Sequence, residues 1–298
     1  MVKFPFYVEG VAVGRGSRKM DNMYKIHKFV IVETQNFASL QRILCLLLFL
    51  FCFIGCKKPD STGRLQINFA TEVDGIPIQY DVLNYVNDAG NHYEVNEVRY
   101  FISRVKLQKS DGTEVTIADN AGIHYYDSDI LYTSNWLVSD ELPVGKYENI
   151  SFVFGLDETQ NVTGYFVNPP EINMAWPDPI GGGYHYMQIN GKWLSNRSNL
   201  TPFCLHTGIG QTYQDNELTG FVQNFFTVTL PLSSFEVKDS EVSKLTLTMN
   251  VNNWFRDPNV YDFNVWGSAI MQNQAAQEVL KENGKNVFSV ISPLSASS

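Results

Sequence analysis

The sequence predicts an all-β protein: an antiparallel β-sandwich with Greek-key-like connections and one short C-terminal helix. Apolar and polar residues alternate in several short runs, most cleanly in 65–69, 225–230 and 245–251, which is typical of strands with one buried face. No helical pattern alternates with these strands, which disfavours parallel α/β folds. Only 268–282 carries apolar residues at helical spacing, and Asn283-Gly284 is a typical helix end.

Further strands follow the same reasoning along the chain. The alternation slips by one residue between the runs 98–103 and 105–107, which indicates a β-bulge. Asn190-Gly191 predicts a tight hairpin turn after the strand 183–189, and this turn would return Trp193 beside that strand. The other expected strands are 76–82, 115–117, 123–126 and 150–154.

The N-terminal segment is expected to be a signal peptide. Its apolar run, 43–54, is too short for a comfortable membrane span. It ends in Gly55-Cys56 followed by two lysines, which resembles a bacterial lipobox, so we expect a lipid on Cys56. A transmembrane anchor is the alternative. The protein would then be lipid-anchored in the bacterial cell envelope, at the outer membrane, on its periplasmic or outer side. The expected organisation is a signal peptide over 1–55, a tether over 56–63 and a folded domain over 64–298.

Charge and cysteine content argue against a nucleic-acid-binding protein and against a disulfide-linked domain. Without the leader, 15 basic and 28 acidic residues remain, a formal charge of −13. Such a domain repels phosphate backbones, so we expect no nucleic-acid partner. Cys204 would be the one cysteine besides the lipidated Cys56, so we expect no intramolecular disulfide. Cys204 is then either a buried inert residue or a thiolate ligand.

Side chains that bind metals gather in 174–206. Strand alternation would place His185 and Met187 on one face. His206 follows His185 by 21 residues in a glycine-rich stretch, so the two could converge, although two unrelated histidines would show the same spacing. Imidazole and thioether groups suit copper better than magnesium or calcium, and structural zinc usually takes four ligands. The common catalytic signatures are absent, so we expect no enzymatic activity.

Several landmarks occur in an order that resembles a known family. They are Val98-Arg99-Tyr100-Phe101, Ile123-His124-Tyr125-Tyr126-Asp127, Pro143-Val144-Gly145, Met174-Ala175-Trp176, Gly183-Tyr184-His185-Tyr186-Met187, Leu205-His206-Thr207-Gly208 and Asn252-Asn253-Trp254. The order is similar to that of the MbnP-like copper-binding domain, a family with many envelope lipoproteins, over roughly residues 63–290.

The resemblance implies an all-β domain that binds copper, with His185 and His206 as ligands. It further implies that Trp176 lies beside the site or is oxidised to kynurenine by a dihaem peroxidase-like partner. We add Met187 as a hypothetical soft ligand. The resulting interpretation is an envelope lipoprotein for copper handling or delivery. The alternative is a β-sandwich module that binds glycans or a surface through exposed aromatic residues, without a metal.

Overall fold

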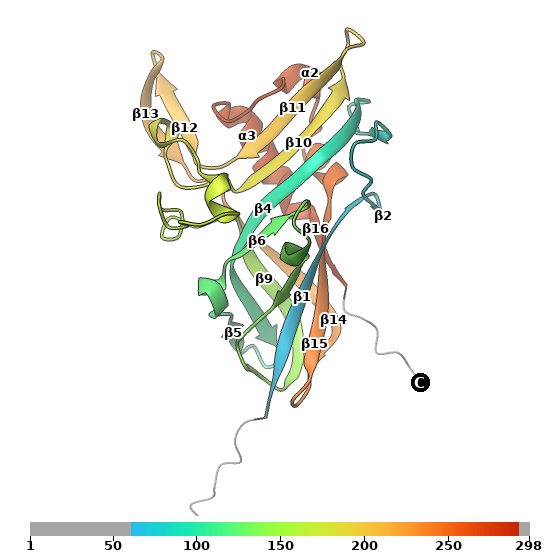
Figure 1. Ribbon diagram of the computed structural model, residues 1–298, viewed down its shortest axis with the longest axis vertical. Helices are drawn as coiled ribbons and strands as arrows, with labels where there is room; N and C mark the ends of the chain where they lie inside the picture. The colour runs from blue at the N-terminus through green and yellow to red at the C-terminus, as the bar shows by residue number, and fades with distance from the viewer. Residues whose placement is uncertain (1–60, 292–298) are drawn as a thin grey trace, which may run out of the picture. The chain divides into compact units, whose positions relative to one another are not determined.

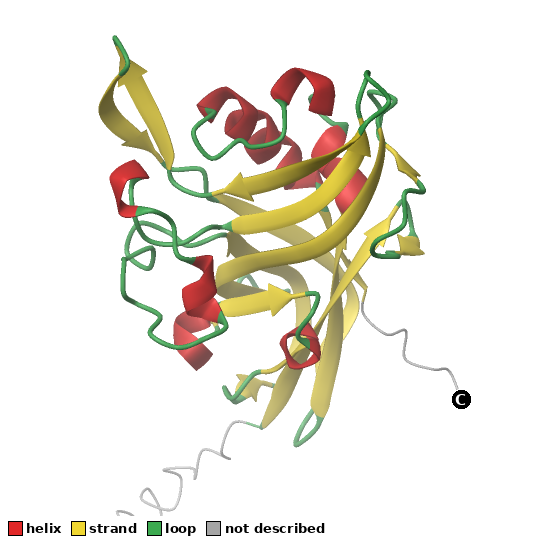
Figure 2. Ribbon diagram, turned by 45° about the horizontal axis from the view of Figure 1, so that its top comes forward, coloured by secondary structure: helices red, strands yellow, loops and turns green. Residues whose placement is uncertain are grey.

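The computed structural model describes residues 61–291, which form two packed β-sheets (Figure 1; strands are yellow in Figure 2). The expected all-β sandwich is confirmed, and its pairings are antiparallel except for the parallel pair β1–β15. The larger sheet has the order β11(Leu200–Thr207), β10(Met187–Leu194), β4(His92–Lys109), β9(Gly145–Phe154) and β14(Phe226–Val237), with β3(Tyr85–Val86), β5(Glu114–Thr116) and β6(His124–Asp127) also paired to β4. The smaller sheet has the order β16(Phe288–Ile291), β15(Val242–Asn250), β1(Thr62–Val73) and β2(Ile76–Pro77), with β7(Asn135–Leu137) and β8(Leu142–Pro143) paired to β1.

Short helices and one hairpin complete the described part of the chain. The hairpin is β12(Gly210–Gln214) with β13(Glu217–Val222), and it extends away from the large sheet in Figure 1. The helices are α2(Phe263–Trp266), α3(Gln274–Asn283) and the 3₁₀ turns η1(Asp119–Gly122), η2(Leu131–Ser134), η3(Glu171–Met174), η4(Asp178–Ile180), η5(Val251–Phe255) and η6(Gly284–Asn286). Among residues 61–291, no helix is long and apolar enough to cross a membrane.

The domain boundary expected at residue 64 is close to the observed start of the fold. β1 begins at Thr62, so the last two residues of the expected tether already belong to a strand. Burial then alternates along all 12 residues of β1, as the apolar–polar alternation predicts. The expected signal peptide and Cys56 lie outside the described residues.

The large sheet is buried on its inner face and on part of its outer face. One face of β4 contributes Val98 and Tyr100 to the core between the sheets. The other face contributes Phe101 to a second apolar cluster, in which Tyr184 and Tyr186 also lie. This second cluster includes residues of the segment between β9 and β10, which therefore covers the outer face of the large sheet there. The candidate site is built where this covering segment returns to the sheet.

The bulge predicted near residue 104 is present. Between β4 and β9 the register shifts between Ser103 and Lys106, and Arg104 has a φ of +53°. The slip in alternation therefore marks one strand of 18 residues with a bulge rather than two strands.

The hairpin turn predicted at Asn190-Gly191 is wrong. Both residues lie inside β10, which continues to Leu194 before the chain turns. A Cβ on Gly191 would lie 2.1 Å from the carbonyl oxygen of Glu94, so glycine is needed here because a neighbouring strand approaches closely. The register between β10 and β4 also shifts at Asn190/Gly191, so the pair forms a bulge in the sheet instead of a turn.

Two other element boundaries differ from expectation. The predicted helix 268–282 begins only at Gln274, where the Asn273 side chain accepts a hydrogen bond from the Ala276 amide and caps the helix. The residues before it serve the sheet edge, because the Cys204 amide donates to the Ser268 carbonyl. In the predicted strand 76–82, only Ile76–Pro77 forms a strand, although the Ile78 amide still donates to the Thr71 carbonyl of β1 (3.1 Å).

Candidate metal centre

Three aromatic rings meet where β10 begins and β11 ends. Trp176 lies in the loop between η3 and η4, His185 lies two residues before β10, and His206 lies in β11. The ring centroids of Trp176 and His185 are 4.7 Å apart. Those of His185 and His206 are 5.0 Å apart, and the two imidazole planes are nearly perpendicular, at 87°. The structure thus brings together three of the side chains that the sequence singles out.

Backbone hydrogen bonds hold the loop of Trp176 against the segment of His185. The Trp176 amide donates to the Gly183 carbonyl (2.8 Å), and the His185 amide donates to the Met174 carbonyl (2.7 Å). Gly183 has a φ of +76°, and a Cβ there would lie 2.3 Å from the Asn161 side chain. Glycine is therefore required for the loop to close in this way.

His185 is buried with one ring nitrogen unpartnered. Its Nδ1 lies 2.9 Å from the Met174 carbonyl oxygen, and since a carbonyl only accepts, Nδ1 carries the proton. Nε2 is buried and has no hydrogen-bond partner among the described residues. Burial lowers the pKa of His185 to about 4, so the imidazole is neutral at pH 7. A buried lone pair without a partner is costly unless it serves as a ligand.

His206 is half-buried and faces His185. Its Nε2 lies 2.9 Å from Oδ1 of Asn190. Burial lowers the pKa of His206 to about 4, and repulsion from a protonated His185 and from Arg99 acts in the same direction. Two imidazole–metal bonds of about 2 Å each place the two nitrogens about 4 Å apart at most, which is comparable with the 5.0 Å between the ring centroids.

Trp176 forms a wall of the site. Its side chain is 2% exposed, and Nε1 donates to the Ile180 carbonyl at 3.1 Å. Gly208 lies against the indole face, since a Cβ there would be 2.7 Å from Cε3. A surface pocket of about 400 Å³, lined also by Phe166 and Tyr184, reaches the indole from outside. The lining of this pocket includes the indole but neither of the two imidazoles.

Met187 is placed differently from expectation. It lies opposite Thr207 and Tyr100 in the sheet and is fully buried in the core between the sheets. His206 lies opposite Gln188, and residues directly opposite share a face, so His206 and Met187 are on opposite faces of the sheet. The predicted common face of His185 and Met187 is wrong because the chain bends at Tyr186 before β10 begins, which interrupts the strand alternation.

Cys204 lies on the same face as His206. It is opposite Asn190 in the pairing of β10 with β11 and is half-buried, with a free thiol. Burial raises the pKa of this thiol above its ordinary value, so the thiol form predominates at neutral pH. Among the two readings open from the sequence, this favours the inert residue.

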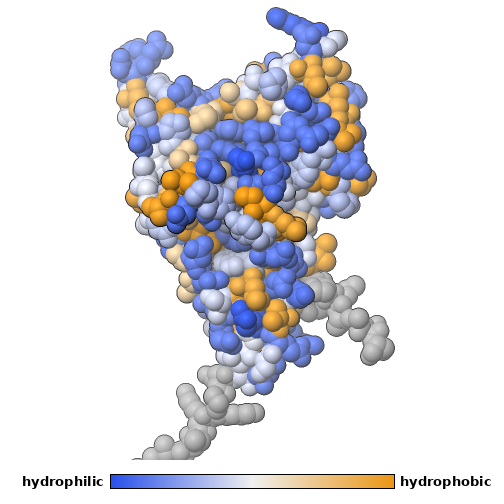
Figure 3. Space-filling view, viewed as in Figure 1, coloured by the Kyte–Doolittle hydropathy of each residue, from blue (hydrophilic) through white to orange (hydrophobic). Residues whose placement is uncertain are grey.

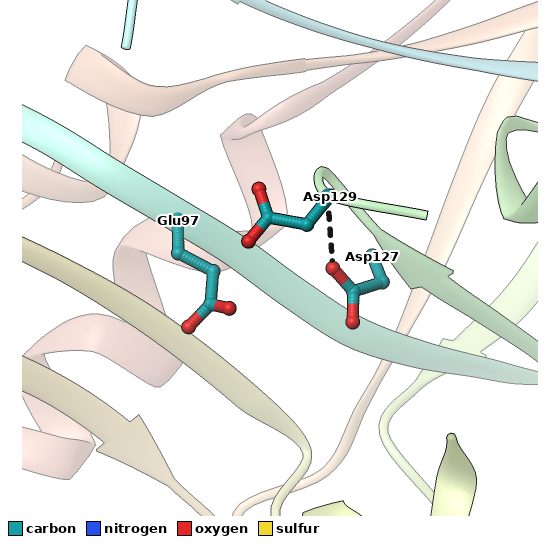
Figure 4. A group of neighbouring side chains, drawn as sticks. All are labelled: Glu97, Asp127 and Asp129. Carbon is teal, nitrogen blue, oxygen red and sulfur yellow. Dashed lines mark hydrogen bonds between the residues drawn. The ribbon is translucent and has the colours of Figure 1, made fainter. Parts of the chain in front are cut away.

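An acidic group lies further along the same face. Ligand oxygens of Glu97, Asp127 and Asp129 lie within 4.8 Å of one another (Figure 4). The Asp129 amide donates to the Asp127 carboxylate (2.9 Å). The guanidinium of Arg99 pairs with Glu97 and with Asp127 (3.1 Å for the second pair). The group is therefore already neutralised in part by a side chain of the same sheet.

Polar side chains around His206 were not singled out from the sequence. Asn190, Glu97 and Arg99 all lie on the face of His206, where hydrophilic residues gather over β4, β10 and β11 (Figure 3). The available signal was the polar half of the alternation in 97–99 and 188–190. It was missed because Asn190-Gly191 matches the stronger signature of a turn.

Comparisons with known proteins agree with the observed fold. A family model described as MbnP matches residues 62–273. Among solved structures, MbnP from Methylosinus trichosporium aligns with a TM-score of 0.52 and 13% sequence identity, over 78% of this chain and 99% of that chain. Curated protein sequences give no match. At this identity the structural likeness supports the fold, whereas the family match rests on the sequence itself.

Proposed function

The chain belongs to the MbnP family, and from this premise we propose that it binds a copper ion through the imidazoles of His185 and His206. One observation carries the proposal: the unpartnered, buried Nε2 of His185 lies in a ring whose centroid is 5.0 Å from that of a second neutral imidazole. Such a pair supplies two lone pairs without any proton having to leave at pH 7.

The donor set suits copper better than other common ions. Imidazole nitrogens favour copper or zinc among the common divalent ions, while magnesium and calcium prefer oxygen. Structural zinc usually takes four protein ligands. Within the described residues, the two imidazoles have no third histidine or carboxylate grouped with them. Copper held by two imidazoles alone could be passed to a partner with more ligands, which suits handling or delivery.

Met187 is not part of the proposed ligand set. The Met187 side chain lies in the main core, on the opposite face of the sheet from His206. Trp176 is instead the neighbour of the metal, because its ring centroid lies 4.7 Å from that of His185. Oxidation of this indole to kynurenine by a dihaem peroxidase-like partner is part of the proposal, and mass spectrometry of the Trp176 peptide from native protein tests it.

The proposed setting is the bacterial cell envelope. This proposal rests on the lipobox-like residues that end in Cys56. A lipid on Cys56 would anchor the domain to a membrane. Metabolic labelling with a fatty acid tests this, with Cys56→Ser as the variant that should lose the label.

Copper loading followed by elemental analysis tests the site. We expect one copper ion per wild-type chain and loss of it in a His185→Ala/His206→Ala double variant. His92→Ala is a matched control, because His92 is an exposed histidine at the start of β4. Full copper stoichiometry in the double variant would refute the assignment.

A further inference from the structure

A continuous hydrogen-bonded chain leads from His206 away from the proposed metal. Nε2 of His206 lies 2.9 Å from Asn190 Oδ1. Asn190 Nδ2 donates in turn to Glu97 Oε2 at 3.0 Å. The other oxygen of Glu97 accepts from the guanidinium of Arg99. All four side chains lie on one face of three neighbouring strands.

The order of donors and acceptors in this chain follows from its far end. The Glu97 carboxylate, paired with Arg99, only accepts hydrogen bonds. The group that Asn190 turns toward Glu97 must therefore be the NH₂ group. The amide oxygen of Asn190 consequently points at His206, and an oxygen acceptor requires a proton on Nε2 of that ring. In the neutral imidazole, Nδ1 is then the nitrogen with a free lone pair.

The same reasoning gives the opposite result for His185. Its Nδ1 donates to the Met174 carbonyl, so Nε2 carries the free lone pair. The two imidazoles therefore have different tautomers, although both belong to one proposed site. A second hydrogen bond that selects the tautomer is a general feature of metal-binding histidines.

We infer that Asn190, oriented by Glu97, is a positioning residue that fixes the tautomer of His206, so that copper binds Nδ1 of His206 and Nε2 of His185. This inference rests on the proposed function, because it specifies the ligand atoms of that site.

The bulge in β10 explains how the sheet directs the Asn190 side chain toward both His206 and Glu97. Asn190 lies opposite Glu97 on one side and Cys204 on the other, and the register shifts immediately after it. His206 is diagonal to Asn190 across the pair of strands, at a distance that longer side chains can span. The Gly191 position, where a Cβ would be 2.4 Å from the Phe203 ring, lets the three strands stay close at this point.

Nitrogen NMR of protein labelled with ¹⁵N-histidine tests the inference without any substitution. In the metal-free protein, long-range ¹H–¹⁵N correlations should show His206 as the Nε2–H tautomer and His185 as the Nδ1–H tautomer. Addition of Cu(I), which is diamagnetic, should then change the ¹⁵N shifts of His206 Nδ1 and His185 Nε2. Loss of the Nε2 proton of His206 on Cu(I) binding, or a metal-free Nδ1–H tautomer of His206, would overturn it.

Three variants separate positioning from general damage. Asn190→Ala should weaken Cu(I) binding by about 10- to 100-fold, as loss of such outer partners usually does, and should mix the His206 tautomers. The double variant Asn190→Asp/Glu97→Gln reverses donor and acceptor at the second bond and should restore a single tautomer. Gln188→Ala is the control, since this amide lies opposite His206 and accepts from Arg99 (3.3 Å).

The outcomes distinguish the inference from the proposed function. No copper uptake by the wild-type protein refutes the proposed function. Copper uptake with unchanged affinity and an unchanged His206 tautomer in Asn190→Ala refutes the positioning role alone. Loss of affinity in Asn190→Ala with recovery in the double variant supports it.

Discussion

Gly208→Ala should disturb the metal site through Trp176 without touching a ligand. The added Cβ would lie 2.7 Å from Cε3 and 2.9 Å from Cδ2 of the indole. Carbon atoms pack at about 3.5–4.0 Å, so the two groups must separate by roughly 1 Å. Gly208 is held from behind, because its amide donates to Gln277 (3.2 Å) and its carbonyl accepts from Asn224 (3.0 Å). The indole is therefore the group that moves, and its neighbour is the imidazole of His185.

The size of this effect follows from overpacking. Inserting a methyl group into a packed region costs about 1–3 kcal/mol, which for a domain of this size lowers Tm by roughly 2–12 °C. Thermal unfolding of the metal-free protein measures the loss of stability. The change in tryptophan fluorescence relative to a Trp176→Phe variant reports the shift of the indole, and copper titration reports the effect on His185. We expect lower stability and weaker copper binding together.

A second glycine provides the control. At Gly220, in the β12–β13 hairpin, a Cβ would meet only the Thr212 hydroxyl at 3.1 Å. Gly220→Ala should therefore change stability by less than about 0.5 kcal/mol. If Gly208→Ala behaves like Gly220→Ala in unfolding, fluorescence and copper binding, the close contact between Gly208 and Trp176 is refuted.

Three further predictions concern the core and pH. Met187→Leu keeps the side-chain volume, so it should cost under about 1.5 kcal/mol and leave copper stoichiometry unchanged; loss of copper would show that the thioether is a ligand. Asn283, whose Nδ2 donates to the Trp254 carbonyl (2.8 Å) and the Asn259 carbonyl (2.7 Å), is fully buried. Asn283→Ala should therefore destabilise the protein by about 2–3 kcal/mol in urea unfolding, and a near-neutral effect would contradict this packing. Burial lowers the pKa of His124 to about 4 from 6.5, so the unfolded chain binds the proton more readily. The stability that neutral His124 contributes is thus full above about pH 6.5 and is lost as pH falls toward 4, by up to about 3 kcal/mol. Urea unfolding between pH 7 and 4.5 measures this loss of stability. If His124→Gln shows the same pH dependence as the wild type, His124 is not the source of the loss.

Several features of the fold could be predicted from sequence because they are local. Alternation along 65–69 and 245–251 reports one buried face of a strand, and the slip near Arg104 reports a bulge, so both were recognisable without partners. The helix start was misplaced for a different reason. Residues 268–269 could follow the helical pattern, but they bond to the edge strand β11, and this long-range contact prevails over local spacing.

In the candidate site, too, some features could be predicted from the sequence and others depend on long-range contacts. The sequence singled out His185, His206 and Trp176, and the structure brings their rings together. Their role as ligands and neighbour of copper stays a prediction. Met187 would share a face with His185 only if strand alternation extended through residue 186, whereas the bend there ends it.

By itself the sequence determined the sandwich class, the family and the types of side chain available for a metal. Periodicity and composition are properties of neighbouring residues, so the unfolded chain already contains them. Only the tertiary structure decided that Met187 faces the core, that Asn190-Gly191 forms a bulge, and that Asn190 joins His206 to Glu97. The physical reason is that strand register and the facing of a side chain are set by partners distant in the sequence, because each partner strand must bury its own apolar face and satisfy its own hydrogen bonds.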